Sequence, residues 1–417
     1  MPLTLLNYSQ VIKLLKVVLT FFLGIIIEFW WLIVLIVALK ISFNLYRTYQ
    51  KKIEKKKKEV KDWVVVEIKI NREILQTPKA MEQVFAGLHS IEKGNISLEI
   101  LSLKKEINFI IRLPREYRKL FESQLYAQYP ELDVSEIYDY FSAFPPFLPN
   151  KDFDLSGSEI IFTHSDYYPI RTYPSFEEVK EEKRIDPLAN LIEAASQLQS
   201  SEYLILQIII QPLNSEKQKK WLDSARKEID KLLGKKKDKP IGWRDWIGSF
   251  IRNFITAFYT LPVWPGAKKE EKPSNPPPLS PGDREKIEKI EEKIAKLSFE
   301  TSIRFLYFGP RQIYDETASL AIPAYFKQFS TENFNAFKIN DEATPKVKTW
   351  LFKNRRTVLK KLNFYELCKT RDSAQTTIIL NTEELASLYH FPVLKVKAPA
   401  LIRSLSRKGE APPNLPL

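Results

Sequence analysis

Few residues of this sequence have the type and spacing that catalysis or metal binding requires. Its three histidines, His89, His164 and His390, are far apart, and none has a second histidine or a cysteine three or four positions away, as a zinc site on one helix would need. The single cysteine, Cys368, has no histidine near it in the sequence that could activate the thiol. We therefore expect all four residues to be structural.

Nucleotide chemistry has no sequence signature either. The chain contains only 11 glycines and no G-x-x-x-x-G-K-[ST] loop, the motif whose backbone amides hold nucleotide phosphates. Gly234-Lys235 is followed by further lysines, so it predicts the end of a helix before a charged run. We expect a protein that is not an enzyme, with no catalytic residues, no cofactor and no metal.

The charge balance predicts an anionic partner. The 417 residues carry a net charge of +13, with a pI near 9.3, which favours a membrane surface or nucleic acid. A single cysteine excludes an intrachain disulfide framework and fits a reducing compartment. Hydrophobic residues make up 44% of the chain, enough for a packed core.

The longest apolar run covers residues 17–39 and predicts one transmembrane helix. Glu28 interrupts the run, and a lone carboxylate is costly in hydrocarbon. The crossing begins either at the start of the run or at Phe29. Trp30 and Trp31 are membrane-interface candidates, because indole rings favour the headgroup boundary.

Lysines follow the apolar run much more densely than they precede it. This bias predicts a single-pass protein of the bacterial cytoplasmic (inner) membrane, with the C-terminus in the cytoplasm. A cleaved signal peptide is the weaker alternative, because no small-residue cleavage site follows. Four consecutive lysines are candidates for binding anionic lipid, or else belong to a solvated spacer: Lys55, Lys56, Lys57 and Lys58.

The first soluble segment has alternating strand and helix patterns. Strands are expected at 63–70, 96–103, 107–113 and 134–141, with helices after Thr77-Pro78 and after Pro114. This β-α-β-β-α-β order predicts a ferredoxin-like unit. Further strands and helices follow, so the expected fold class is α+β: an N-terminal transmembrane helix, then two ferredoxin-like α/β sandwich units, the second with a long insertion.

These patterns divide the chain into six segments. We expect a membrane anchor at 1–46, a basic juxtamembrane helix at 47–62 and a ferredoxin-like domain at 63–144. A second α+β domain comprises 145–234 and 282–397, with an insertion at 235–281, and 398–417 forms a C-terminal tail.

The insertion contains an amphipathic helical pattern at 241–258 followed by a proline-rich linker. Four aromatic residues of its apolar stripe are membrane-interface candidates: Trp243, Trp246, Phe250 and Phe254. The same stripe could pack on its own domain or on a partner protein.

The C-terminal stretch from residue 378 predicts a docking or linker segment. Asn381 can cap a short helix with two carboxylates in its first turn, and His390-Phe391 ends it before a proline. Partner-docking candidates are Glu383, Glu384, His390 and Phe391. An ordinary frayed terminus is the alternative.

Several stretches resemble a known bacterial region: WVVVEIKI, TPKAMEQVFAGLHSI, FIIRLPREYRKLFESQLYAQYPELDVSEIYDY, FETSIRFLYFG and ILNTEELASLYHFPVLKVKAPAL. The sequence is similar to the membrane-anchored N-terminal region of conjugative-coupling (type IV secretion) or hexameric-translocase ATPases of candidate-phyla bacteria. In that family the last stretch leads into a P-loop ATPase core, whereas this chain stops at Leu417. The resemblance therefore implies a membrane platform for an ATPase that is either encoded separately or lost from this chain.

Two functions are compatible with these patterns. The first is a non-catalytic, membrane-tethered platform for assembling a P-loop ATPase that translocates DNA or protein. The second is a stand-alone, basic, membrane-associated nucleic-acid-binding protein. The expected partners are a lipid bilayer and a P-loop ATPase, with self-association and indirect contact with nucleic acid also considered.

Overall fold

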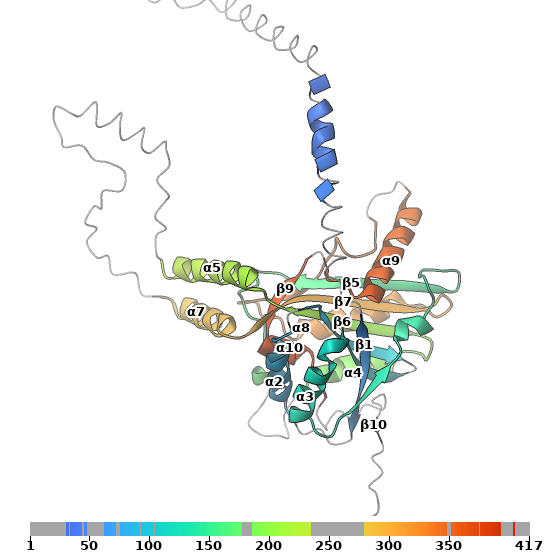
Figure 1. The fold of residues 1–417 in the computed structure, drawn as a ribbon, viewed down its shortest axis with the longest axis horizontal. Helices are drawn as coiled ribbons and strands as arrows, with labels where there is room; N and C mark the ends of the chain where they lie inside the picture. Colours follow the sequence, from blue (N-terminus) through green and yellow to red (C-terminus); the bar gives the residue numbers. More distant parts are fainter. Residues whose placement is uncertain are drawn as a thin grey trace, which may run out of the picture. The chain divides into compact units, whose positions relative to one another are not determined.

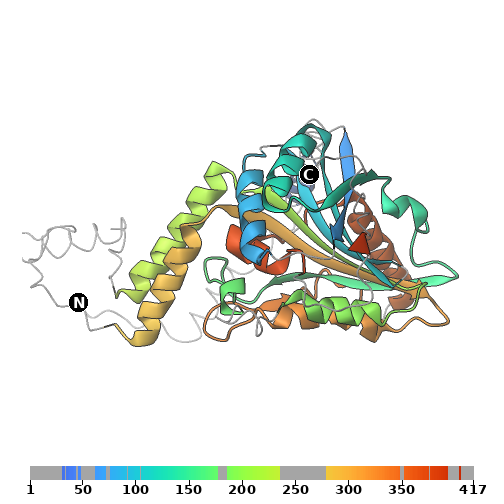
Figure 2. The same ribbon diagram turned by 90° about the horizontal axis from the view of Figure 1, so that it is seen from below.

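The computed structural model describes residues 31–32, 34–43, 46–47, 62–71, 76–91, 93–103, 105–176, 186–234, 279–347, 352–374, 376–392 and 403–404. The chain forms two compact units, Met1–Lys61 and Asp62–Leu417. Each is described by itself, and Figures 1 and 2 show their elements.

The first unit is helical wherever it is described. Within the described residues, no helix is long and apolar enough to cross a membrane. This finding contradicts the predicted transmembrane helix and the predicted single-pass location in the bacterial cytoplasmic membrane.

The second unit is built on one sheet in which nine strands pair antiparallel (Figure 1). Its main path runs β4-β1-β3-β2-β6-β7-β5-β8, with β9 continuing beside β7 and the two-residue β10 parallel to the end of β1. The strands are β1 (Trp63–Asn71), β2 (Ile96–Leu103), β3 (Glu106–Pro114), β4 (Asp133–Ile137), β5 (Phe153–Phe162), β6 (Tyr203–Pro212), β7 (Ser298–Pro310), β8 (Phe337–Ile339), β9 (Ile378–Asn381) and β10 (Arg403–Ser404).

Helices cover both faces of this sheet. The first face packs against five helices, α2 (Pro78–Leu88), α3 (Arg118–Gln128), α4 (Leu188–Ser196), α8 (Ala321–Lys327) and α10 (Thr382–Leu388). The second face packs against α9 (Lys353–Thr370) and the short 3-10 helix η2 (Tyr140–Ala143). The remaining short 3-10 helices are η1 (Arg115–Tyr117), η3 (Tyr173–Ser175) and η5 (Glu316–Leu320).

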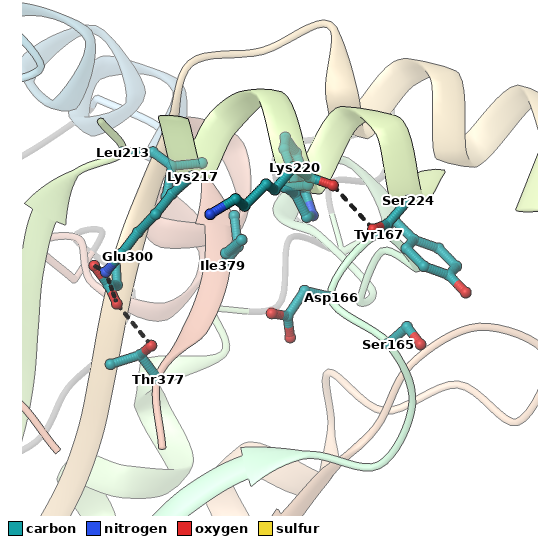
Figure 3. A pocket seen from close by; sticks show the side chains of 11 residues that line it. Ser165, Asp166, Tyr167, Leu213, Lys217, Lys220, Ser224, Glu300, Thr377 and Ile379 are labelled. Atoms are coloured by element: carbon teal, nitrogen blue, oxygen red, sulfur yellow. Dashed lines mark hydrogen bonds and ion pairs between the residues drawn. The ribbon is translucent and has the colours of Figure 1, made fainter. Parts of the chain in front are cut away.

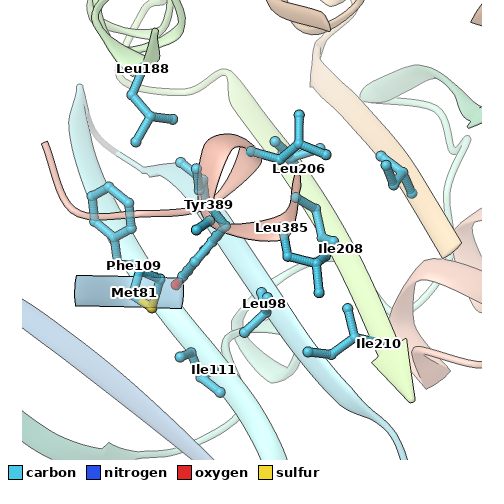
Figure 4. Close-up of a cluster of buried hydrophobic side chains, with 14 of the residues drawn as sticks. Met81, Leu98, Phe109, Ile111, Leu188, Leu206, Ile208, Ile210, Leu385 and Tyr389 are labelled. Atoms are coloured by element: carbon cyan, nitrogen blue, oxygen red, sulfur yellow. The ribbon is translucent and has the colours of Figure 1, made fainter. Parts of the chain in front are cut away.

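The predicted fold class is wrong in its architecture as well as in its transmembrane helix. Strand β2 pairs with β6 over seven residue pairs, Ile96↔Ile210 to Ser102↔Leu204. The strands assigned to two sandwich units therefore form one sheet, and a single hydrophobic core runs under both halves. Figure 4 shows part of that core, where α2 and α10 meet β2, β3 and β6.

Two helices form an arm that interrupts the hairpin between β6 and β7. Helix α5 (Ser215–Leu232) leaves β6, and α7 (Pro281–Ile294) returns to β7. They pack together through Ala225, Ile229 and Ile290, a small core separate from those of the sheet. Figure 2 shows the pair extending away from the sheet.

A row of polar side chains crosses the centre of the sheet on its second face. Glu99 of β2 lies opposite Gln207 of β6, Gln207 opposite Arg304 of β7, and Arg304 opposite Glu159 of β5. The Asn340 amide then donates to the Glu159 carboxylate at 3.3 Å. All five side chains are buried, so their charged and polar groups depend on partners within the protein.

Candidate functional site

A cleft of about 500 Å³ lies at the base of the arm. Figure 3 shows Lys217 and Lys220 of α5 on one side and Asp166 and Thr377 on the other. The other lining residues are Ser165, Tyr167, Leu213, Trp221, Ser224, Glu300 and Ile379. The cleft thus brings together four segments that are far apart in the sequence.

The carboxylate of Glu300 is already neutralised on one wall of the cleft. The Lys217 ammonium lies 2.6 and 2.8 Å from its two oxygens, and the Thr377 hydroxyl donates to it at 2.9 Å. Lys217 is half exposed, and pairs of this kind contribute little to stability. Their effect here is to hold the base of α5 against β7.

Asp166 is the lining group whose proton affinity changes most. Its pKa is raised to about 6, mainly by burial and also by the nearby Glu384 carboxylate, while Lys293 and the Ile379 amide act in the opposite direction. Behind it, Lys293 pairs with Glu384 at 3.0 Å, and both side chains are 1% exposed. Asp166, which is only partly buried, is therefore the third charge of a triad with the buried Lys293–Glu384 pair, and it can gain a proton near pH 6.

Trp221 lines the cleft, but its indole nitrogen is buried and has no acceptor among the described residues. A buried donor without an acceptor is costly.

These groups can bind but do not form a recognisable catalytic set. No nucleophile–base pair lines the cleft, which nucleophilic catalysis requires. Over the described ranges, no three His, Cys, Asp or Glu side chains are grouped to hold a metal ion.

A second polar cluster holds helix α9 on the sheet. Arg371, directly after α9, donates to Glu99 at 2.9 Å and to Asp139 at 2.9 Å. Tyr140 and Ser97 also donate to Glu99, each at 2.6 Å. Burial alone would lower the pKa of Arg371, but the charge of Glu99 and the hydrogen bond to Asp139 hold it well above its usual value.

The carbonyl groups at the end of α9 are satisfied from the polar row. Gln207 donates to the Cys368 carbonyl at 3.0 Å, and Arg304 donates to the Leu367 carbonyl at 2.7 Å and to the Asp372 carbonyl. Cations are favourable at a helix C-terminus. The last turns of α9 and Arg371 are therefore fixed to three strands of the sheet, β2, β6 and β7.

The family comparison covers most of the chain. Residues 39–402 match the model of a domain of unknown function, DUF8128. The chain belongs to the DUF8128 family. No curated protein matches it. The family description assigns no activity, so the resemblance to coupling-ATPase regions stays a prediction.

The predicted docking residues of this DUF8128 chain lie inside the fold. Glu384 completes the predicted cap of α10: Asn381 accepts from the Glu384 amide, and the Glu384 carboxylate accepts from the Asn381 amide. Glu383 pairs with Lys296. His390 contacts the Ala386 carbonyl at 2.8 Å. These contacts give the residues structural roles in the DUF8128 fold.

Phe391, His89 and Cys368 are also packed, whereas His164 is exposed. Phe391 makes edge-to-face contacts with Phe109 and Tyr129. His89 follows the last residue of α2 and lies 3.3 Å from the Ser298 carbonyl. Burial raises the pKa of the Cys368 thiol to about 12, which keeps it protonated and unreactive at neutral pH.

The interface and lipid candidates fall mostly outside the described residues. Trp31 is described and exposed. The others, Trp30, Trp243, Trp246, Phe250, Phe254 and Lys55 to Lys58, lie outside the described ranges. Their assignment stays a prediction.

Sequence reasoning missed the triad of the DUF8128 cleft. Lys293 follows Ile290 by three positions on a helix of alternating charges, so it lies on the buried face of that helix. A lysine on an apolar stripe was the available signal. Asp166 comes from a loop whose position next to β9 has no local sequence signal.

Proposed function

We propose that this DUF8128 protein is a non-catalytic assembly module that binds and positions a P-loop translocation ATPase. The observation that supports it is the α5–α7 arm, a helical hairpin carried by the central strands of a rigid sheet. The sequence resemblance favours the same class of partner.

The arm suits a role in holding the segment between α5 and α7 away from the sheet, because it adds little to the core of the sheet. Its two helices make their own small hydrophobic contact, and α5 exposes charged residues along most of its length. The strands beneath it, β6 and β7, pair over ten residues, Tyr203↔Phe308 to Pro212↔Phe299. A rigid base with a separate arm suits a protein that holds a partner at a defined position.

The sequence between the two helices strengthens the proposal. Residues 241–258 have the aromatic stripe described above. In the sequence they lie between the end of α5 and the start of α7. Their structure lies outside the described ranges. An aromatic-rich stripe is the composition expected at the centre of a protein–protein interface.

The test is to replace residues 235–279 with a short glycine–serine linker, keeping α5 and α7. Antiparallel helices can be joined by short loops, so the urea midpoint of the described fold should change little. We expect an ATPase co-expressed with the chain to co-purify with the original protein and not with the variant.

The matched control keeps the length and replaces the aromatic stripe only, as Trp243→Ser, Trp246→Ser, Phe250→Ser and Phe254→Ser. Loss of the ATPase from both variants, with unchanged unfolding, supports the proposal. Undiminished co-purification with the linker variant would contradict it. So would failure of any P-loop ATPase to co-purify with the original chain.

A further inference from the structure

Helix α9 has two halves with different surroundings. Its C-terminal half is buried through Phe364, Tyr365 and Cys368 and is fixed by the polar row. Its N-terminal half extends beyond the sheet (Figure 1), and residues 352–356 and 358–360 are exposed. Packing in the core explains the C-terminal half of the helix but not the N-terminal half.

The exposed half carries one sign of charge. From 343 to 365 the sequence has seven cations and no carboxylate: Lys346, Lys348, Lys353, Arg355, Arg356, Lys360 and Lys361. Lys346 and Lys361 pair with Glu316 and Asp154, each at 2.6 Å. Among the described residues, Lys353 and Arg355 have no carboxylate partner. These two lie in the first turn, where the helix dipole opposes positive charge.

We propose that the exposed half of α9, residues 352–360, binds the backbone of single-stranded nucleic acid. A polynucleotide supplies closely spaced phosphates to match a run of cations without carboxylates. Arginine adds a planar fork that fits phosphate. This surface is distinct from the arm and does not rest on the proposed ATPase partner.

An exposed aromatic ring favours nucleic acid over an acidic protein. Phe352, directly before α9, is 71% exposed and lies next to Lys353 in the sequence. Single-strand-binding surfaces combine cations that follow the backbone with rings on which bases stack. An acidic peptide offers the cations partners but gives this ring none.

The experiment measures binding of the full-length protein to a fluorescent single-stranded oligonucleotide over a series of salt concentrations. The test variant is Lys353→Gln, Arg355→Gln and Lys360→Gln. We expect weaker binding and a plot of log K against log salt that is shallower by about 2, because each lost phosphate contact contributes about 0.7 on a single strand. Phe352→Ala should weaken binding without changing the slope.

The matched control removes the same charges from α5, as Lys219→Gln, Arg226→Gln and Lys227→Gln, three residues that are also exposed. Unchanged binding in this control, with loss in the α9 variant, supports the proposal. Equal loss in both variants would show a general charge effect and overturn it. Polyglutamate that competes as well as unlabelled oligonucleotide would also overturn it, in favour of an acidic protein partner.

Discussion

The buried Glu99 carboxylate has four hydrogen-bond donors around it. Its carboxylate accepts hydrogen bonds from Arg371, Tyr140, Ser97 and Gln207. Arg371 is also packed against the rings of Tyr140 and Phe141, at 5.1 and 4.8 Å from their centres. Each partner therefore depends on the other remaining charged.

Arg371→Met should destabilise the protein by about 3–5 kcal/mol, because it leaves the Glu99 charge buried without its counter-ion. Adding Glu99→Gln should recover part of this loss, since the amide is neutral and still accepts hydrogen bonds. Urea unfolding measures both. Arg226→Met, at an exposed position, is the control and should stay within about 0.5 kcal/mol. Equal effects at the two arginines would contradict the role given to Arg371.

Asp166 should make stability depend on pH between about 4 and 6. Its pKa is raised from 3.8 to about 6 on folding, so the folded state binds more protons than the unfolded state in this window. Stability then falls as pH rises, by at most about 3 kcal/mol at 1.36 kcal/mol per pKa unit. Asp166→Asn should remove this slope. Parallel pH profiles for the two proteins, from urea unfolding, would rule out the assignment.

At the scale of elements, helix α9 begins against the usual rules. No acidic residue lies in its first turn, and the side chain before it forms no capping hydrogen bond. Lys353→Glu with Arg355→Glu should therefore stabilise the fold by about 0.3–1 kcal/mol per residue while lowering nucleic-acid binding. Lys369→Glu, in the last turn, should have the opposite effect on stability. Thermal unfolding of the first-turn variant and of the Lys369→Glu variant tests this. A first-turn variant that is less stable than the original protein would contradict it.

The sequence predicted the elements that bury a full stripe or a full strand. Helix α2 was expected where it occurs, and so were β2 and β3. The Asn381 cap was also predicted correctly. Helix α2 begins after Thr77 as expected, but the Thr77 side chain forms no capping hydrogen bond.

Helix α9 was missed because only its last turns are buried. Phe364, Tyr365 and Cys368 are its buried residues, too few to make a periodic pattern over 18 residues. The cleft was missed for a related reason. Its walls come from α5, β7, β9 and the loop after β5, and no local pattern records which segments meet across a sheet.

At the scale of the whole molecule, the second unit should unfold as one. Strands β2 and β6 join the halves, and residues of both halves share one core. Hydrogen exchange of β1 and β7 amides in urea should show a common midpoint, because neither half can open without exposing that core. Two separate midpoints would show that the halves are independent domains.

The joining of the halves could not be read from the sequence. Strands β2 and β6 are buried on both faces, so their apolar runs predict strands but do not say which strands pair. A turn or linker between the halves was visible, and it suggested two units. Only the hydrogen-bonded register shows that they are one.

The polar row affects the register in which the central strands pair. Side chains alternate between the two faces of a strand, so a slip of one residue would move Gln207, Arg304 or Glu159 into the apolar core on the other face. Strands such as β6 and β7 are apolar on both sides and could otherwise slide with little penalty. The row therefore favours one register. At the observed register the polar side chain of each central strand meets those of its neighbours, and any other register buries an unpaired charge or amide.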